Sequence, residues 1–157
     1  MIIIAHRGNI DGPDSLQENH PDFIDDALKL GFDVEIDLRI KDGDFYLGHD
    51  KPTYKVSLEW IYKRKEKLWI HCKDRESLDN LSSSYIDFHY FYHTTDQYTL
   101  TSHAIGWICL AQLPIKNAII VLPEEVSFYD DYDRILQCKG ICTNKPIFYK
   151  KELNGYE

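Results

Sequence analysis

Short segments with strand-like composition recur along this chain, and they constrain its fold more than any other feature. The first, residues 2–5, is an unbroken and largely β-branched apolar run, which is typical of a strand buried on both faces. The second, residues 32–40, alternates apolar and charged side chains with a period of two. Further strands are predicted at residues 45–47, 68–72, 88–92, 105–110, 118–122 and 140–143. The chain is therefore expected to fold around a sheet.

Helical patterns separate the earlier strands. Pro21 is a favourable first-turn residue, apolar side chains recur at helical spacing after it, and Gly31 is a typical helix end. Shorter helices are predicted at residues 58–65 and 75–81. Strands that alternate with helices in this way indicate an α/β fold with mainly parallel strands.

The length of the chain limits the choice among α/β architectures. The chain has 157 residues, whereas a full eightfold α/β barrel typically needs roughly 200 or more. Its later half is predicted to be rich in strands and poor in helices. We therefore predict a reduced TIM-type (β/α) barrel with several helices trimmed to loops, forming a single domain over residues 1–157. An open doubly wound sheet is the alternative, but the chain has no Gly-rich nucleotide fingerprint to support it.

Charge and composition exclude some partners. A formal net charge of −8 argues against binding nucleic acid by broad phosphate neutralisation. It is compatible with a small anionic substrate, because a bound cation can reverse the local field. No segment approaches the roughly 18 apolar residues that span a bilayer. The N-terminus lacks the basic region of a signal peptide and the cysteines are scattered, so a cytoplasmic location is expected.

Polar residues follow the predicted strands, at the positions where α/β folds place their sites. Glu35 and Asp37 are two apart on one strand, so they share a face and repel each other unless a cation lies between them. Oxygen ligands at this spacing suit Mg²⁺ or Ca²⁺. His6 and His49 can share the general base and general acid roles, and Arg7 offers a planar donor fork to a phosphate. Taken singly, each residue also fits a solvated strand face or a structural hydrogen bond.

These residues belong to a longer series of segments. The series comprises His6-Arg7-Gly8, Glu18-Asn19, Gly31-Phe-Asp-Val-Glu35-Ile-Asp37, Asp42-Gly43, Gly48-His49-Asp50 and, near the C-terminus, Gly140-Ile-Cys-Thr143-Asn144-Lys-Pro146. In order and spacing, the first fifty residues resemble the glycerophosphodiester phosphodiesterase family, within the phospholipase-C-like phosphodiesterase superfamily. The chain looks like a short, reduced member, and its middle matches poorly.

The resemblance implies a barrel enzyme that hydrolyses a small or lipid-derived phosphodiester. It implies a divalent metal held by Glu35 and Asp37, with His6 and His49 as the acid/base pair. In the family, a substrate hydroxyl attacks phosphorus with the help of one histidine, the other protonates the leaving alcohol, and water then opens the cyclic phosphate. Glu18 would organise the His-Arg pair or the metal; as a carboxylate at a helix start it has an equally good structural explanation.

The chain departs from the family pattern in three places. Where the family has Glu-x-Lys on its third strand, this chain has His71 and Lys73. Lys73 can still meet a phosphate oxygen, whereas an imidazole in place of a carboxylate favours Mn²⁺ or Zn²⁺. The family's insertion after His-Asp, which shapes its glycerol pocket, is missing, and Asn144 stands where the family has Asp.

The sequence leaves three alternatives open. A catalytically reduced protein, which keeps the phosphate pocket as a sensor or scaffold, is the alternative function. Glu124 follows a predicted strand and is either a pocket residue or a surface carboxylate at a helix start. A trimmed barrel exposes apolar strand surface, so pairing of two chains into a homodimer is also open.

Overall fold

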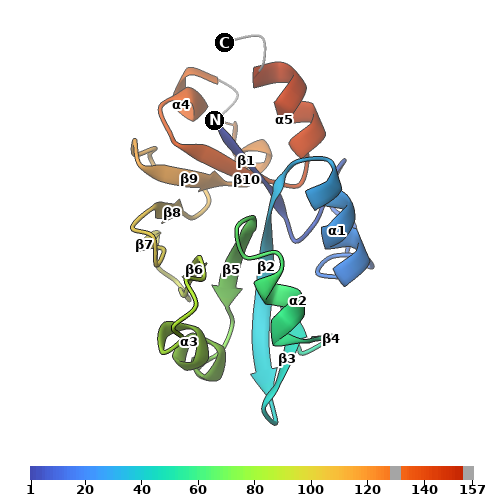
Figure 1. Ribbon diagram of the computed structural model, residues 1–157. Coiled ribbons are helices and arrows are strands. Elements are labelled where there is room, and N and C mark those ends of the chain that lie inside the picture. Colours follow the sequence, from blue (N-terminus) through green and yellow to red (C-terminus); the bar gives the residue numbers. More distant parts are fainter. Residues whose placement is uncertain (128–131, 154–157) are drawn as a thin grey trace.

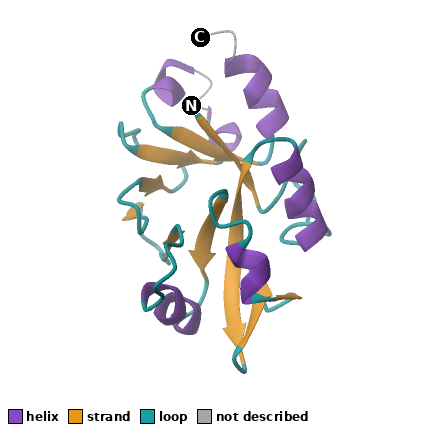
Figure 2. Cartoon of the chain, in the orientation of Figure 1, coloured by secondary structure: helices purple, strands orange, loops and turns teal. Residues whose placement is uncertain are grey.

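The computed structural model describes residues 1–127 and 132–153, and it shows a single curved sheet with a few helices around it (Figures 1 and 2). The strands are β1 (Ile2–His6), β2 (Asp33–Lys41), β3 (Asp44–Leu47), β4 (Tyr54–Val56), β5 (Leu68–Cys72), β6 (Tyr90–Phe91), β7 (Tyr98–Leu100), β8 (Gly106–Ile108), β9 (Ala118–Val121) and β10 (Gly140–Thr143). The helices are α1 (Pro21–Lys29), α2 (Leu58–Tyr62), α3 (Arg75–Ser82), the 3₁₀ turn η1 (Pro123–Glu125), α4 (Tyr132–Leu136) and α5 (Pro146–Leu153).

The strands are mostly parallel. Parallel pairs connect β6, β5, β2, β1, β10, β9 and β8 in that spatial order. Antiparallel β7 flanks β8, and the β3–β4 hairpin extends from the distal half of β2. Among the described strands no pairing joins β6 to β7 or β8, so the sheet curls without closing.

The prediction of a reduced TIM-type barrel is therefore wrong. The structure is a mixed α/β fold with an open, curled half-barrel sheet, mostly strands and few helices, rather than a ring of alternating β/α units. The cause lies in the later half, where β6, β7 and β8 have only two or three residues each. Strands this short form few ladder hydrogen bonds, and the connections between β6 and β9 contain no helix to cover them.

The sheet packs a core on each of its faces. The face toward the helices buries residues such as Ile24 of α1 and Val34 and Ile36 of β2. The concave face holds a second group drawn from separate strands: Ile4, Trp69, Phe91, Ile105, Trp107, Ile119 and Cys142. Because side chains alternate along a strand, His6 and His71 lie on this concave face, two residues beyond Ile4 and Trp69. The polar groups thus cover the inner core at the carboxyl ends of the strands.

Candidate functional site

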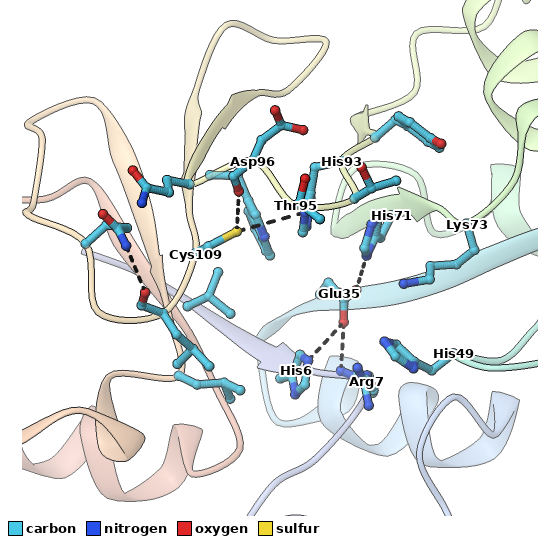
Figure 3. Close-up of a pocket in the computed structure, with 18 residues that line it drawn as sticks. His6, Arg7, Glu35, His49, His71, Lys73, His93, Thr95, Asp96 and Cys109 are labelled. Carbon is cyan, nitrogen blue, oxygen red and sulfur yellow. Dashed lines mark hydrogen bonds and ion pairs between the residues drawn. The ribbon is translucent and has the colours of Figure 1, made fainter.

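Six of the nine predicted site residues line one pocket of about 730 Å³ at the carboxyl ends of the strands (Figure 3). One side, which we call the first wall, is lined by His6, Arg7, Glu35, His49, His71 and Lys73. The opposite side, the second wall, is lined by residues between 92 and 112, namely Tyr92, His93, Thr94, Thr95, Asp96, Gln97, Trp107, Cys109, Leu110 and Gln112. The structure therefore assembles, around one space, groups that lie far apart in the sequence.

Glu35 and His71 of the first wall form a buried cluster with Asp37, which does not itself line the pocket. The parallel register of β2 and β5 sets Asp37 beside His71, and the alternation along β2 puts Glu35 on the same face. The His71 Nδ1 atom lies 3.4 Å from Asp37 Oδ1 and 3.9 Å from Glu35 Oε1. One ligand atom from each residue lies within 4.8 Å of the others, a spacing that can hold a metal ion.

Asp37 is held by Asn19, which belongs to the Glu18-Asn19 segment of the sequence but had no predicted role. The Asn19 Nδ2 group donates to Asp37 Oδ2 at 2.9 Å, and the Asp37 backbone N–H donates to Asn19 Oδ1 at 2.9 Å. Asn19 has φ of 64°, in the left-handed region that Asn tolerates better than most residues. This two-point contact fixes one carboxylate oxygen and leaves the other, Oδ1, turned toward His71.

Two cations border the carboxylates. The Arg7 guanidinium donates through Nη1 to Glu18 at 3.1 Å, and its Nε lies 3.1 Å from Asp37 Oδ2 without the alignment of a hydrogen bond. The Arg7 backbone N–H donates to Glu35 Oε2 at 3.2 Å. Lys73 Nζ lies 3.7 Å from Asp37 Oδ1 and lines the pocket. Glu18 thus orients Arg7 through an ion pair and does not belong to the carboxylate cluster itself.

The pKa values of the two central carboxylates are shifted in opposite directions. Burial, reinforced by the charge of Asp37, raises the pKa of Glu35 to about 8. Burial alone would also raise the pKa of Asp37, but the adjoining His71, Arg7 and Asn19 groups outweigh it and hold that pKa below its ordinary value. The pair therefore carries one proton near neutral pH when no cation is bound.

A metal ion fits this cluster on the chemistry of its donors. Asp37 Oδ1 is buried and accepts no hydrogen bond, and Glu35 would have to hold a proton in the absence of a cation. Two carboxylates and one imidazole suit Mg²⁺ or Mn²⁺, and the imidazole also suits Zn²⁺. Ca²⁺ takes about six to eight oxygen ligands and is matched less well by this set.

Hydrogen bonds fix the tautomer of His6. The Asp14 backbone N–H donates to Asn9 Oδ1, so Asn9 Nδ2 is the group that donates to Asn144 Oδ1, at 2.8 Å. Asn144 Oδ1 is therefore an acceptor, and His6 Nδ1, at 2.9 Å from it, carries the proton. The free lone pair is on Nε2, 4.0 Å from Glu35 Oε2. Burial, followed by the charge of Arg7, lowers the pKa of His6 to about 4, so its imidazole is neutral at pH 7.

Glu124 lies behind this network and does not line the pocket. Its carboxylate accepts from the Thr143 hydroxyl at 2.9 Å and from the Asn144 backbone N–H at 2.8 Å. Those contacts hold the end of β10, which carries the Asn144 side chain that orients His6. The structure thus places Glu124 in a supporting position, reached through Asn144.

His49 stands on a tight turn after β3. Gly48 has φ of 150°, and a Cβ at this position would overlap the Lys51 carbonyl oxygen. The Arg39 guanidinium donates to the Gly48 and His49 carbonyl oxygens and so ties this turn to β2. His49 Nδ1 lies 2.7 Å from Asp50 Oδ1, and 41% of the side chain is exposed. A proton held on Nδ1 by Asp50 leaves Nε2 free to face the pocket.

The second wall contains an imidazole and a thiol that the sequence did not connect with the site. His93 stacks on His71 with ring centroids 4.6 Å apart, and Cys109 Sγ lies 3.9 Å from His93 Nδ1 (Figure 3). The pairing of β5 with β6, which sets His71 beside Phe91, brings His93 there two residues later. No spacing in the sequence marks His93, because its position depends on a strand pair of two residues. Burial and the neighbouring His71 lower the pKa of His93 to about 4.

Comparison with known proteins adds no relative. No family model, no curated protein and no solved structure matches the chain. The resemblance to glycerophosphodiester phosphodiesterases therefore remains a prediction from sequence segments. Within the described residues, no helix has both the length and the apolar character needed to cross a membrane.

Proposed function

We propose that this protein is a metal-dependent phosphodiesterase that acts on a small or lipid-derived phosphodiester. The observation that carries the proposal is the convergence of a buried Glu35–Asp37–His71 cluster, two cations and two free imidazole nitrogens on one pocket. An acid/base pair beside a metal cluster and phosphate-binding cations is the set of groups that phosphodiester cleavage needs. It also agrees with the sequence segments that resemble phosphodiesterases.

Different pocket residues would bind the phosphate and the metal ion. Lys73 and the outer face of the Arg7 guanidinium bind the non-bridging oxygens of the phosphate, since both line the pocket. A divalent ion held by Glu35, Asp37 and His71 would supply further positive charge against the charge that develops at phosphorus. These groups hold the diester with its phosphorus above the cluster.

His6 is suited to remove a proton from the attacking hydroxyl, of the substrate or of water. Its imidazole is neutral because of burial, and its Nε2 lone pair is kept free by the bond from Nδ1 to Asn144. His49 is the candidate to protonate the leaving alcohol, because it lines the pocket on the other side of Arg7 and Asp50 holds its Nδ1 atom in place. Figure 3 shows the two rings on either side of Arg7, as proton transfer to and from opposite faces of one phosphate requires.

Hydrolysis of bis(p-nitrophenyl) phosphate, measured with a panel of divalent ions, tests this proposal. The wild-type protein should release p-nitrophenol only with an added ion, most readily Mg²⁺ or Mn²⁺, and EDTA should abolish the reaction. The Arg64→Lys variant is a control, since Arg64 pairs with Asp25 away from the pocket. A protein that binds Mn²⁺ and inorganic phosphate but shows no turnover with any ion would favour the sensor or scaffold alternative.

The compartment is part of the proposal as well. All four cysteines are unpaired thiols, and burial raises the pKa of Cys72 to about 12, which makes it unreactive. Unpaired thiols of this kind are usual in reducing compartments. We therefore assign the protein to the cytoplasm, with a phosphodiester as its partner and no nucleic acid.

A further inference from the structure

We propose that the substrate is an amphiphilic phosphodiester whose alkyl or acyl chain lies on an apolar rim beside the pocket. The inference rests on the function proposed above and names its substrate class. The apolar rim consists of Tyr92, Tyr98, Leu110 and Leu113, with 41%, 42%, 43% and 67% of each residue exposed. Single exposed apolar residues are ordinary on a protein surface, whereas adjoining ones indicate a binding site.

The rim is continuous with the pocket. Tyr92 and Leu110 line the pocket as well as being exposed. Farther out, the Tyr98 hydroxyl donates to the Leu113 carbonyl oxygen at 3.1 Å, so these two residues adjoin. The Cys109 backbone N–H donates to the Gln97 carbonyl oxygen at 3.0 Å and holds the two segments of the rim together. An elongated ligand can therefore run from the pocket onto this surface.

The chemistry of the rim selects an uncharged extension of the ligand. From Tyr92 to Ile115, Asp96 is the only Asp, Glu, Lys or Arg, in a chain of which 28% is charged. The cations that face the pocket, Arg7 and Lys73, belong to the first wall. A ligand with one anionic centre and an apolar chain matches both ends, whereas a second phosphate or an acidic peptide would find no cation on the rim.

Tyr92 and Leu110 line the pocket and are also exposed on the surface. A single bound substrate can contact them in both places. A substrate whose phosphate is bound by Lys73 carries its chain past these residues on leaving the pocket. A second protein chain seated on the rim would cover the same residues and obstruct the pocket mouth. We therefore assign the rim to the substrate and treat self-association as a competing outcome of the test.

Calorimetric titration with dimethyl, butyl methyl and octyl methyl phosphate, each with saturating Mg²⁺ and below its micelle concentration, tests the inference. Affinity should rise by about two- to fourfold for each added methylene that the rim covers. The double variant Tyr98→Ser/Leu113→Ser, at two rim residues that do not line the pocket, should lose this dependence on chain length and still bind dimethyl phosphate as the wild type does. Leu58→Ser, at a residue 39% exposed on α2, is the matched control and should retain it.

The outcomes separate this inference from the proposed function. Wild-type protein that binds dimethyl phosphate with no gain from a longer chain would overturn the inference and leave the proposed function intact. A gain that survives in the double variant would also overturn it, because the chain then binds elsewhere. Wild-type dimers that dissociate in the double variant would reassign the rim to self-association. Protein that binds none of the three diesters would fail the proposed function, and this inference with it.

Discussion

The first wall of the pocket differs from the second wall in how its side chains are held. In the first wall and the buried cluster that adjoins it, Asp37 is fixed by Asn19, His6 by Asn144 and Arg7 by Glu18, all within 3.1 Å. Asp37 lies within the nine-residue strand β2, and His6 and Arg7 stand at the end of β1. In the second wall, Thr94, Thr95 and Gln97 are exposed and lie on loops between strands of two or three residues.

For the proposed phosphodiesterase, this difference indicates which wall would carry the chemistry and which would select the substrate. Proton transfer and metal binding need side chains fixed within a fraction of an ångström, which a network on rigid strands provides. Loops tolerate change more readily and are the usual place for specificity. The first wall is therefore suited to the reaction, and the second wall is suited to choosing what is attached to the phosphate.

Replacing one imidazole in each wall gives the strongest test of the proposed difference between the walls. Burial lowers the pKa of both His6 and His93 to about 4, and both line the pocket, but they stand in opposite walls. His6→Ala should lower kcat by roughly 10²–10⁴, the usual contribution of a general base. His93→Ala should change kcat by no more than about threefold. Stopped-assay turnover of bis(p-nitrophenyl) phosphate measures both, with circular dichroism as the check on folding. An equal loss of kcat in the two variants would show that the two walls do not have different roles.

The accuracy of the strand predictions also differs between the central strands and the short strands next to the second wall. The strands predicted at 68–72 and 140–143 agree with β5 and β10, and the one at 118–122 differs from β9 by one residue. Each is a strongly apolar run whose burial dictates its conformation. The segments 88–92 and 105–110 instead shrink to two and three residues. Their ends, including Tyr92 and Leu110, leave the sheet to line the pocket, which local composition does not reveal.

The candidate site shows a similar limit. Glu35 and Asp37 were readable because the strand period alone puts them on one face, and His6 because it directly follows a buried strand. The Asn9–Asn144–His6 network joins residues 135 or more positions apart, and the Asn19 contact depends on a left-handed backbone. The prediction of a reduced TIM-type barrel was wrong because barrel closure depends on pairing between β6 and its far neighbour, a long-range property with no local signal.

The pH dependence of metal binding tests whether Glu35 is a metal ligand in the first wall. Because the pKa of Glu35 is raised to about 8 without an ion, an incoming cation must displace a proton from it. Affinity should therefore rise about tenfold for each pH unit from 6 toward 8 and level off above that. Burial lowers the pKa of His71 below its ordinary value, so this residue contributes less than Glu35 to the protons released at pH 7. Calorimetry of Mn²⁺ binding in two buffers of different ionisation enthalpy should show about one proton released at pH 7. In Glu35→Gln the release should vanish, and its persistence there would place the proton elsewhere.

Two aspartate-to-asparagine variants test whether the metal ion binds at the buried cluster or at the second wall. Asp37→Asn should weaken Mn²⁺ binding by about tenfold or more, since even supporting residues around a metal often cost that much. Asp96→Asn should leave the affinity unchanged, because Asp96 is an exposed carboxylate of the second wall. Calorimetric dissociation constants for the two variants decide the matter. A larger loss in Asp96→Asn would move the ion out of the buried cluster and onto the loops.

The smallest expected effect concerns His71, a first-wall residue that also contacts the second wall through His93. Its ring faces Asp37 on one side and stacks on His93 on the other. His71→Glu would add a third buried carboxylate to the cluster, where it is costly without a cation and is relieved by one. The free energy of Mg²⁺ binding should therefore become more favourable by about 1–2 kcal/mol, near the lower end of the values for charge-assisted interactions. His71→Gln, which removes the imidazole without adding charge, should show no such gain. If His71→Glu folds normally and binds Mg²⁺ no better, residue 71 belongs functionally to the second wall, and the ion must be held by Glu35 and Asp37 alone.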